Sequence, residues 1–112
     1  MMNCQRYDFD VQQGATWFQQ LAYEVDGEPV NIESYSARMK VRKSYDLPVV
    51  VSLSIDNGIE IEDVNKINIE LTATQTAALV PGRYLYDVEL IDDDQVERVL
   101  FGVFTVSAEV TK

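Results

Sequence analysis

The sequence contains no histidine and a single cysteine, Cys4. Without histidine, the chain lacks the commonest general base, the commonest zinc ligand and the side chain that titrates near neutral pH. A Ser-His or Cys-His nucleophile pair is therefore excluded within this chain, and one cysteine cannot form a disulfide within it. We expect a protein that is not an enzyme, holds no cofactor or metal, and folds without an oxidising compartment.

Long apolar runs and positive charge are also scarce. No stretch approaches the roughly 18 apolar residues of a membrane helix, and no apolar signal-peptide core precedes Tyr7. Only 9 lysines and arginines oppose 19 aspartates and glutamates, which gives a net charge of −10. Because such a surface repels phosphate backbones and anionic lipids, we expect neither a nucleic-acid nor a membrane partner. Because there is no signal-peptide core, we expect synthesis in the cytoplasm.

The 112 residues have an ordinary composition for one globular domain, with 46% hydrophobic residues. Their dominant pattern is the alternation of apolar and polar side chains that marks half-buried strands. The pattern predicts about seven strands in a single domain spanning 1–112, drawn from segments at 7–11, 16–25, 36–43, 49–55, 59–61, 67–71, 83–91 and 96–106.

Turn residues separate these segments. Asp26-Gly27 and Asp56-Asn57-Gly58 predict hairpin turns, because aspartate, asparagine and glycine tolerate the positive φ that such turns require. Pro29 restricts the residues after the first turn to an edge strand or a loop. Gly102 predicts a bulge or bend in the last strand. A short helical turn is expected near 74–79, with Thr74 as its N-cap.

No predicted helix is long enough to cover a sheet, so a sheet with one apolar face has to bury that face against a second sheet. The sequence therefore predicts an all-β, antiparallel sandwich. Tyr84 follows the tight Pro81-Gly82 corner and precedes the strongest strand. This placement is typical of the tyrosine corner of immunoglobulin-like sandwiches, although Tyr84 would also serve as an ordinary core aromatic.

Several segments carry a further signature. They are Leu71-Thr72, Gly82-Arg83-Tyr84-Leu85-Tyr86-Asp87, Gly102-Val103-Phe104-Thr105-Val106 and Glu109-Val110-Thr111, with Gly14-Ala15-Thr16-Trp17, Asp26-Gly27-Glu28-Pro29 and 36–42 upstream. Together they resemble a family of small tailed-phage virion proteins, similar to the N-terminal domain of phage baseplate upper proteins. The chain departs from the family at Ser107-Ala108, where a proline is common.

The resemblance implies an immunoglobulin-like sandwich that attaches other parts to a phage particle. The expected function is that of a virion or tail-associated structural protein, encoded by a phage or prophage and acting through protein–protein contacts. The implied partners are other virion proteins or further copies of the chain. The implied location is the host cytoplasm during assembly and then the particle.

Two groups of side chains are candidates for the contact surface. Arg38, Lys40 and Arg42 alternate along one predicted strand and form a positive stripe on an acidic protein. They either pair with carboxylates on a neighbouring strand or form half of a charge-complementary interface. Trp17 and Phe18 are adjacent, so one of them points away from the core, and exposed aromatics such as these and Tyr45 anchor interfaces.

Other clusters have simpler interpretations. Asp92, Asp93 and Asp94 offer carboxylates to calcium but lack the six to eight oxygens of a calcium site, so we interpret them as a polar hairpin tip. Two further functions stay open. A carbohydrate- or surface-binding module would need an aromatic platform on one sheet face. An acidic inhibitor of a nucleic-acid enzyme would need continuous acidic ridges.

Overall fold

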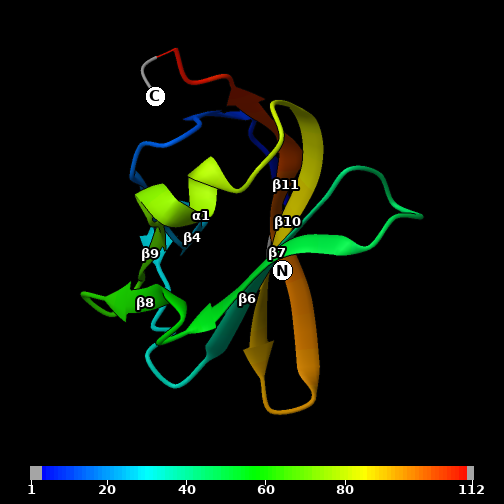
Figure 1. The fold of residues 1–112 in the computed structure, drawn as a ribbon. Coiled ribbons are helices and arrows are strands. Elements are labelled where there is room, and N and C mark those ends of the chain that lie inside the picture. The colour runs from blue at the N-terminus through cyan, green and yellow to red at the C-terminus, as the bar shows by residue number, and fades with distance from the viewer. Residues whose placement is uncertain (1–3, 111–112) are drawn as a thin grey trace.

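The structure is a computed structural model, and it describes residues 4–110. Nearly all of its regular elements are strands (Figure 1). Along the chain they are β1 (Gln5–Arg6), β2 (Phe9–Gln12), β3 (Trp17–Ala22), β4 (Glu24–Val25), β5 (Glu28–Pro29), β6 (Ser36–Arg42), β7 (Val49–Ile55), β8 (Gly58–Glu62), β9 (Lys66–Leu71), α1 (Ala73–Ala77), β10 (Gly82–Asp92) and β11 (Gln95–Ser107).

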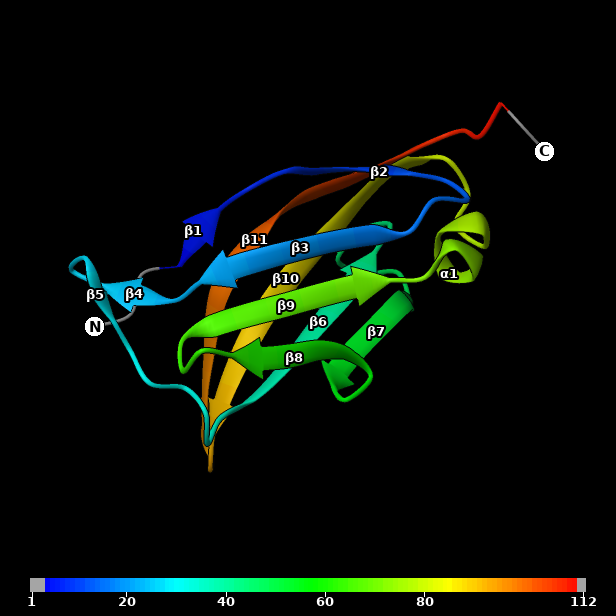
Figure 2. The ribbon, with the colours of Figure 1, turned by 90° about the vertical axis from the view of Figure 1, so that its left-hand side faces the viewer.

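The strands form two layers that face each other (Figure 2). The first layer runs in the order β11-β10-β6-β7, with β1 and β2 both pairing in parallel along the far edge of β11. The second layer runs β8-β9-β3 and is antiparallel throughout. Figure 2 shows the strands of the second layer passing in front of those of the first. The outer faces of the two layers therefore point away from each other.

The core lies between the layers because each long strand alternates buried and exposed positions. In β6 the buried set is Ala37, Met39 and Val41, and all three have no exposed surface. Ile59 of β8 and Ile69 of β9 are equally buried from the opposite layer. At about 25 cal/mol per Å² of buried apolar surface, this shared interior is the main stabilising contribution to the fold.

The prediction of an immunoglobulin-like β-sandwich with about seven strands is confirmed. Within residues 4–110, seven strands have five residues or more. The predicted turn at Asp26-Gly27 is present: both residues have positive φ, at 54° and 79°, and they join β4 to β5 as a small hairpin. Pro29 lies in β5, within that two-stranded sheet.

The prediction of a hairpin at Asp56-Asn57-Gly58 is wrong. Asp56 and Gly58 do have positive φ, but β7 and β8 pair in parallel over only two residues. The turn instead carries the chain from one layer to the other. The reason is that Leu53 and Ile59 are both buried in the core from different sheets, and the residues of a turn do not determine whether its flanking strands pair.

The bulge predicted at Gly102 lies elsewhere. The register between β10 and β11 shifts where Val88 opposes Leu100 and Glu89 opposes Arg98, so Val99 is the extra residue. Position 102 requires glycine for a different reason, because a Cβ there would lie 2.2 Å from the backbone oxygen of Tyr7. The glycine lets the segment between β1 and β2 approach β11 closely.

The helical turn is present as α1, but its N-cap is Thr72 and not Thr74. Thr72 Oγ1 accepts a hydrogen bond from the Gln75 backbone N–H at 3.1 Å, and the Thr72 N–H donates to Gln75 Oε1 at 2.8 Å. This reciprocal capping box requires a Gln or Glu three residues after the cap, which Thr72 has and Thr74 lacks. No helix in the described part of the chain has the length and apolar character needed to cross a membrane.

Candidate interaction surface

The outer face of β6, β10 and β11 collects most of the positive charge of the sheet. Arg38, Lys40 and Arg42 alternate with buried residues of β6 and so point outward. Arg83 of β10 and Arg98 of β11 lie on the same face. Arg83 alternates with the buried residues of β10, and Arg98 lies opposite the outward-facing Glu89 in register. We call this surface the basic face; it lies on the side of β6, β10 and β11 that is turned away from β8 and β9 in Figure 1.

Two carboxylates of β10 lie within the basic face. Glu89 is opposite Arg38 in register, and Arg38 Nε lies 2.5 Å from Glu89 Oε1. Asp87 is opposite Lys40. The sequence left two interpretations of these cations, pairing with carboxylates on a neighbouring strand or contacting a partner. The first of them applies to Arg38. The outward residues of β6, β10 and β11 thus comprise five cations and two carboxylates, in a protein whose net charge is −10. Asp10 of β2 adds a carboxylate at the edge of this face, opposite Thr105 in register and so next to Arg83.

Burial raises the pKa of Asp87, and the nearby Glu89 raises it further, while Arg98, Arg42 and Arg38 act in the opposite direction. The three arginines belong to the two strands that flank β10, so cations from both sides lie near the Asp87 carboxylate.

A hollow opens beside these charges. It has a volume of about 220 Å³ and is lined by Lys40, Arg42, Tyr45, Leu85, Asp87 and Glu89. The loop that carries Tyr45 is attached to the strand, because Arg42 Nη1 donates a hydrogen bond to the Leu47 carbonyl at 2.9 Å. Tyr45 leaves 75% of its surface exposed at the rim of the hollow.

The basic face also has an apolar part. Leu85 lies opposite Val103 in register, and Phe101 lies opposite Asp87. The guanidinium carbon of Arg98 is 4.8 Å from the centre of the Phe101 ring, within cation–π distance. Positive charge, an exposed tyrosine and partly buried apolar side chains thus share one surface, which is the composition of many protein interfaces.

The outer face of β3, β8 and β9 has the opposite charge. Its outward carboxylates are Glu60, Glu62 and Glu70, and Lys66 is the one lysine among its described strand residues. Phe18 of β3 lies opposite Glu70 in register and leaves 57% of its surface exposed. We call this surface the acidic face.

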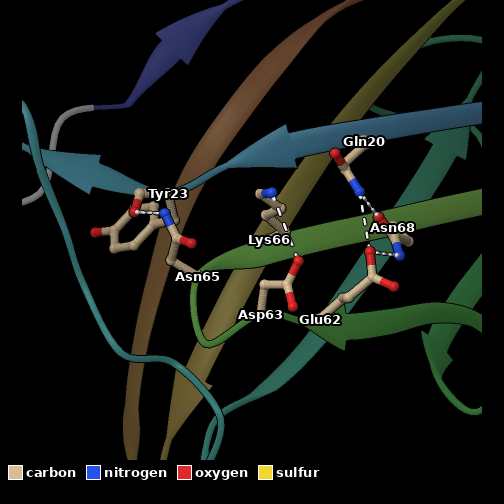
Figure 3. Close-up of polar contacts among 7 residues, drawn as sticks. All are labelled: Gln20, Tyr23, Glu62, Asp63, Asn65, Lys66 and Asn68. Atoms are coloured by element: carbon tan, nitrogen blue, oxygen red, sulfur yellow. Dashed lines mark hydrogen bonds and ion pairs between the residues drawn. The ribbon is translucent and has the colours of Figure 1, made fainter.

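Side-chain amides order the middle of the acidic face (Figure 3). Gln20 Nε2 donates to Asn68 Oδ1 at 2.9 Å and to Glu62 Oε1 at 3.2 Å. At the end of the same face, Lys66 Nζ lies 3.6 Å from Asp63 Oδ2. Lys66 also lies opposite Glu62 in register, whereas Glu60 lies opposite Asn68 and Glu70 opposite Phe18, so these two carboxylates have no cation opposite them.

The structure separates the candidate residues of the sequence analysis. Arg38, Lys40, Arg42 and Tyr45 come together on the basic face, while Phe18 lies on the acidic face. Trp17 points inward, with its ring 5.1 Å from that of Phe9 and 5.4 Å from that of Phe104. One aromatic on the acidic face does not make the platform that a carbohydrate-binding module would need.

Tyr84 has the geometry of a tyrosine corner. Its hydroxyl donates a hydrogen bond to the Val80 carbonyl at 2.6 Å, its ring is buried, and Lys43 Nζ lies 4.5 Å from the ring centre. Its role here is structural, because it fixes the crossing from α1 into β10.

The sequence analysis missed Arg83, Arg98 and Phe101. The alternation around Tyr84 would have placed Arg83 outward. The outward positions of Arg98 and Phe101 follow from the bulge at Val99, which shifts the alternation within β11. No residue pattern in the sequence indicates this bulge.

The aspartates at 92–94 form the tip of the β10–β11 hairpin, with Asp93 at a φ of 55°. Positive φ is common for aspartate in tight turns, so the polar residues fit the turn. Within residues 4–110, no three histidine, cysteine, aspartate or glutamate side chains are grouped as a metal site would need.

Comparisons with known proteins bear on the fold alone. No family model and no curated protein matches this sequence. Among solved structures, the chain is similar to the extracellular domains of the voltage-gated sodium channel beta4 subunit, described as parallel homodimers, with 13% identity, 98% of each chain covered and a TM-score of 0.46. It is also similar to a structure from a study of cell-adhesive interactions of sodium channel beta subunits, with 11% identity, 95% of this chain and 93% of the other covered, and a TM-score of 0.45.

Proposed function

We propose that this chain is a non-enzymatic structural protein of a tailed-phage particle or prophage, and that it works by binding other proteins of the assembly through its basic face. The observation that carries the contact surface is that Arg38, Lys40, Arg42, Arg83 and Arg98 share one face of a protein with a net charge of −10, and that Lys40 and Arg42 line a hollow beside the exposed Tyr45. Charge of one sign gathered on one face directs which partner binds and in which orientation.

The assignment to a phage particle is supported by the resemblance of the segments at 71–72, 82–87 and 102–106 to small virion proteins. A sandwich whose two layers share one buried core also suits a structural part, because it presents a rigid surface to its neighbours. The chemistry of the chain agrees with a role in binding, since it has no histidine.

The test is mass spectrometry of purified particles from the phage or prophage that encodes the chain. We expect the protein to be present in a constant ratio to other virion proteins. We also expect the double variant Lys40→Glu/Arg42→Glu to be incorporated at least about tenfold less than the parent, because like charges placed at an interface cost several kcal/mol.

A matched control keeps the interpretation clear. The variant Glu28→Lys/Glu33→Lys changes as many charges on exposed residues that lie on neither face, and its incorporation should equal that of the parent. Particles that never contain the parent protein would overturn the virion assignment. Equal incorporation of the basic-face variant would overturn the assignment of the contact surface.

A further inference from the structure

The two outer faces of the sandwich have opposite charge, and each has an aromatic side chain exposed within it. We propose that the basic face of one copy binds the acidic face of a second copy, so that copies associate face to back. This inference rests on the proposed function and deepens it by naming another copy of the chain as a partner of the basic face.

The charges of the two faces are complementary. The basic face presents Arg38, Lys40 and Arg42 along a single strand. The acidic face presents Glu60 and Glu62 along β8 and Glu70 on β9. Along β6 and along β8 the charges repeat at every second residue, so they lie roughly 7 Å apart within each strand, and Glu70 adds a single carboxylate on the neighbouring β9. A row of cations on one copy can therefore meet a row of carboxylates on the next at matching intervals.

The shapes are complementary as well. Phe18 stands 57% exposed beside Glu60 and Glu70, at the rim of a shallow hollow that these residues share. The hollow of the basic face, between Tyr45 and Leu85, has a volume of about 220 Å³. That space accommodates an aromatic ring, and Lys40 and Arg42 at its wall would contact the ring face as cations.

The molecule is large enough for such a contact. It measures 43 × 29 × 23 Å, so a broad face of the sandwich offers the ~800 Å² per partner that a stable protein interface buries. Each copy would bury its basic face against one neighbour and its acidic face against another.

Symmetry limits which oligomers this contact can form. The two faces lie on opposite sides of the sandwich, so the contact joins different surfaces of the two copies. A contact of this kind cannot close as a two-fold dimer; it continues into a ring or an open stack.

The net charge of −10 opposes association, but it acts over a longer distance than the paired rows do. At physiological ionic strength, charges more than about 8 Å apart are largely screened. Opposite charges in direct contact are screened less, so the local attraction between the faces persists where the general repulsion fades.

The test uses two charge-reversed variants of the full chain. In the first, Lys40→Glu/Arg42→Glu, both faces are acidic; in the second, Glu60→Lys/Glu70→Lys, the acidic face becomes basic. We expect the parent to associate with increasing concentration in sedimentation velocity, and each variant alone to associate at least about tenfold more weakly. Circular dichroism establishes that both variants are folded.

Mixing the two variants in equal amounts provides the decisive measurement. The first variant keeps a native acidic face and the second keeps a native basic face, so the mixture contains one native contact and should form complexes that neither variant forms alone. The variant Phe18→Ala should weaken association of the parent, whereas Val80→Ala, at an exposed residue outside both faces, should leave it unchanged.

The outcomes separate the inference from the proposed function. Variants that associate as well as the parent, or a mixture that stays as monomeric as its components, would overturn the face-to-back contact. If the parent is nevertheless found in purified particles, the proposed function stands and the basic face binds a different virion protein. If the reversed variants are too unstable to purify, Lys40→Gln/Arg42→Gln and Glu60→Gln/Glu70→Gln make the same comparison with smaller effects.

Discussion

Three buried tyrosines differ in what their hydroxyl groups bind, and this difference is open to measurement. The Tyr84 hydroxyl donates to the Val80 carbonyl at 2.6 Å, so Tyr84→Phe removes a hydrogen bond and leaves that carbonyl without it. We expect the free energy of unfolding to fall by about 1–2 kcal/mol in urea denaturation. Tyr45→Phe, at a side chain that is 75% exposed, should leave the free energy of unfolding unchanged. Equal stability of the two variants would contradict the tyrosine corner.

Tyr23 should behave in the opposite way. Its hydroxyl is buried and has no hydrogen-bond partner among residues 4–110. Because burying an unpaired hydroxyl is unfavourable, Tyr23→Phe should maintain or increase the free energy of unfolding at neutral pH. A loss of more than about 1 kcal/mol would show that the hydroxyl is paired.

The buried tyrosines also predict how stability depends on pH. Burial raises the pKa of Tyr23 from 10.0 to about 12, with smaller effects from Glu97 and Tyr35, and burial raises the pKa of Tyr86 as well. The unfolded chain therefore loses these protons at a lower pH than the folded protein does. The contribution of Tyr23 is complete below pH 10 and is lost as pH rises toward 12. Tyr23→Phe should make this alkaline loss of stability smaller, as urea midpoints at increasing pH would show; an unchanged pH dependence would contradict the assignment.

At the scale of elements, the side chain of Thr76 connects α1 to the loop before β3. Thr76 is fully buried; its Oγ1 donates to the Ala15 carbonyl at 2.8 Å and accepts from the Gly14 N–H at 3.0 Å. The nearly isosteric Thr76→Val would leave both backbone groups unpaired and should lower the free energy of unfolding by about 2 kcal/mol. Thr74→Val, at an exposed residue of the same helix, should change it by less than about 0.5 kcal/mol. Similar effects of the two variants would contradict this role of Thr76.

The segment between β1 and β2 also approaches β11 closely, and this contact requires a glycine at position 102. In Gly102→Ala the new Cβ would lie 2.2 Å from Tyr7 O, the same oxygen that accepts the Tyr86 hydroxyl bond at 2.5 Å. The segment has to move and that bond is lost, so we expect a destabilisation above about 2 kcal/mol in chemical denaturation. A variant as stable as the parent would show that the segment adapts freely.

Which strands exist could be predicted from the sequence, whereas their partners could not. Alternation is local, so the residues at 36–43 and 83–91 predict strands and their inward sets directly. The turn at 56–58 has the residues of a hairpin, yet it joins two layers, because the pairing of β7 and β8 depends on core contacts distant in sequence. Likewise, the bulge at Val99 arises from the pairing of β10 with β11 and leaves no trace in composition.

At the scale of the whole molecule, the sequence alone did not predict how charge is divided between the two outer faces. The stripe of Arg38, Lys40 and Arg42 was visible from alternation alone. That Arg83 and Arg98 join it, and that Glu60 and Glu70 lie on the opposite side with Phe18, follows only from the order of strands in the two layers. A chain with a net charge of −10 thereby acquires one positive face.

Contact between the basic face of one copy and the acidic face of another can be detected by cross-linking. Equal amounts of isotopically light and heavy chain are mixed and treated with a carbodiimide, which joins a lysine amine to a carboxylate in direct contact. If the two faces meet, we expect cross-links between light and heavy chains from Lys40 to Glu60 or Glu70. Mixed-isotope cross-links that avoid these carboxylates, or the complete absence of mixed-isotope cross-links at concentrations where the parent associates, would show that the two faces do not meet.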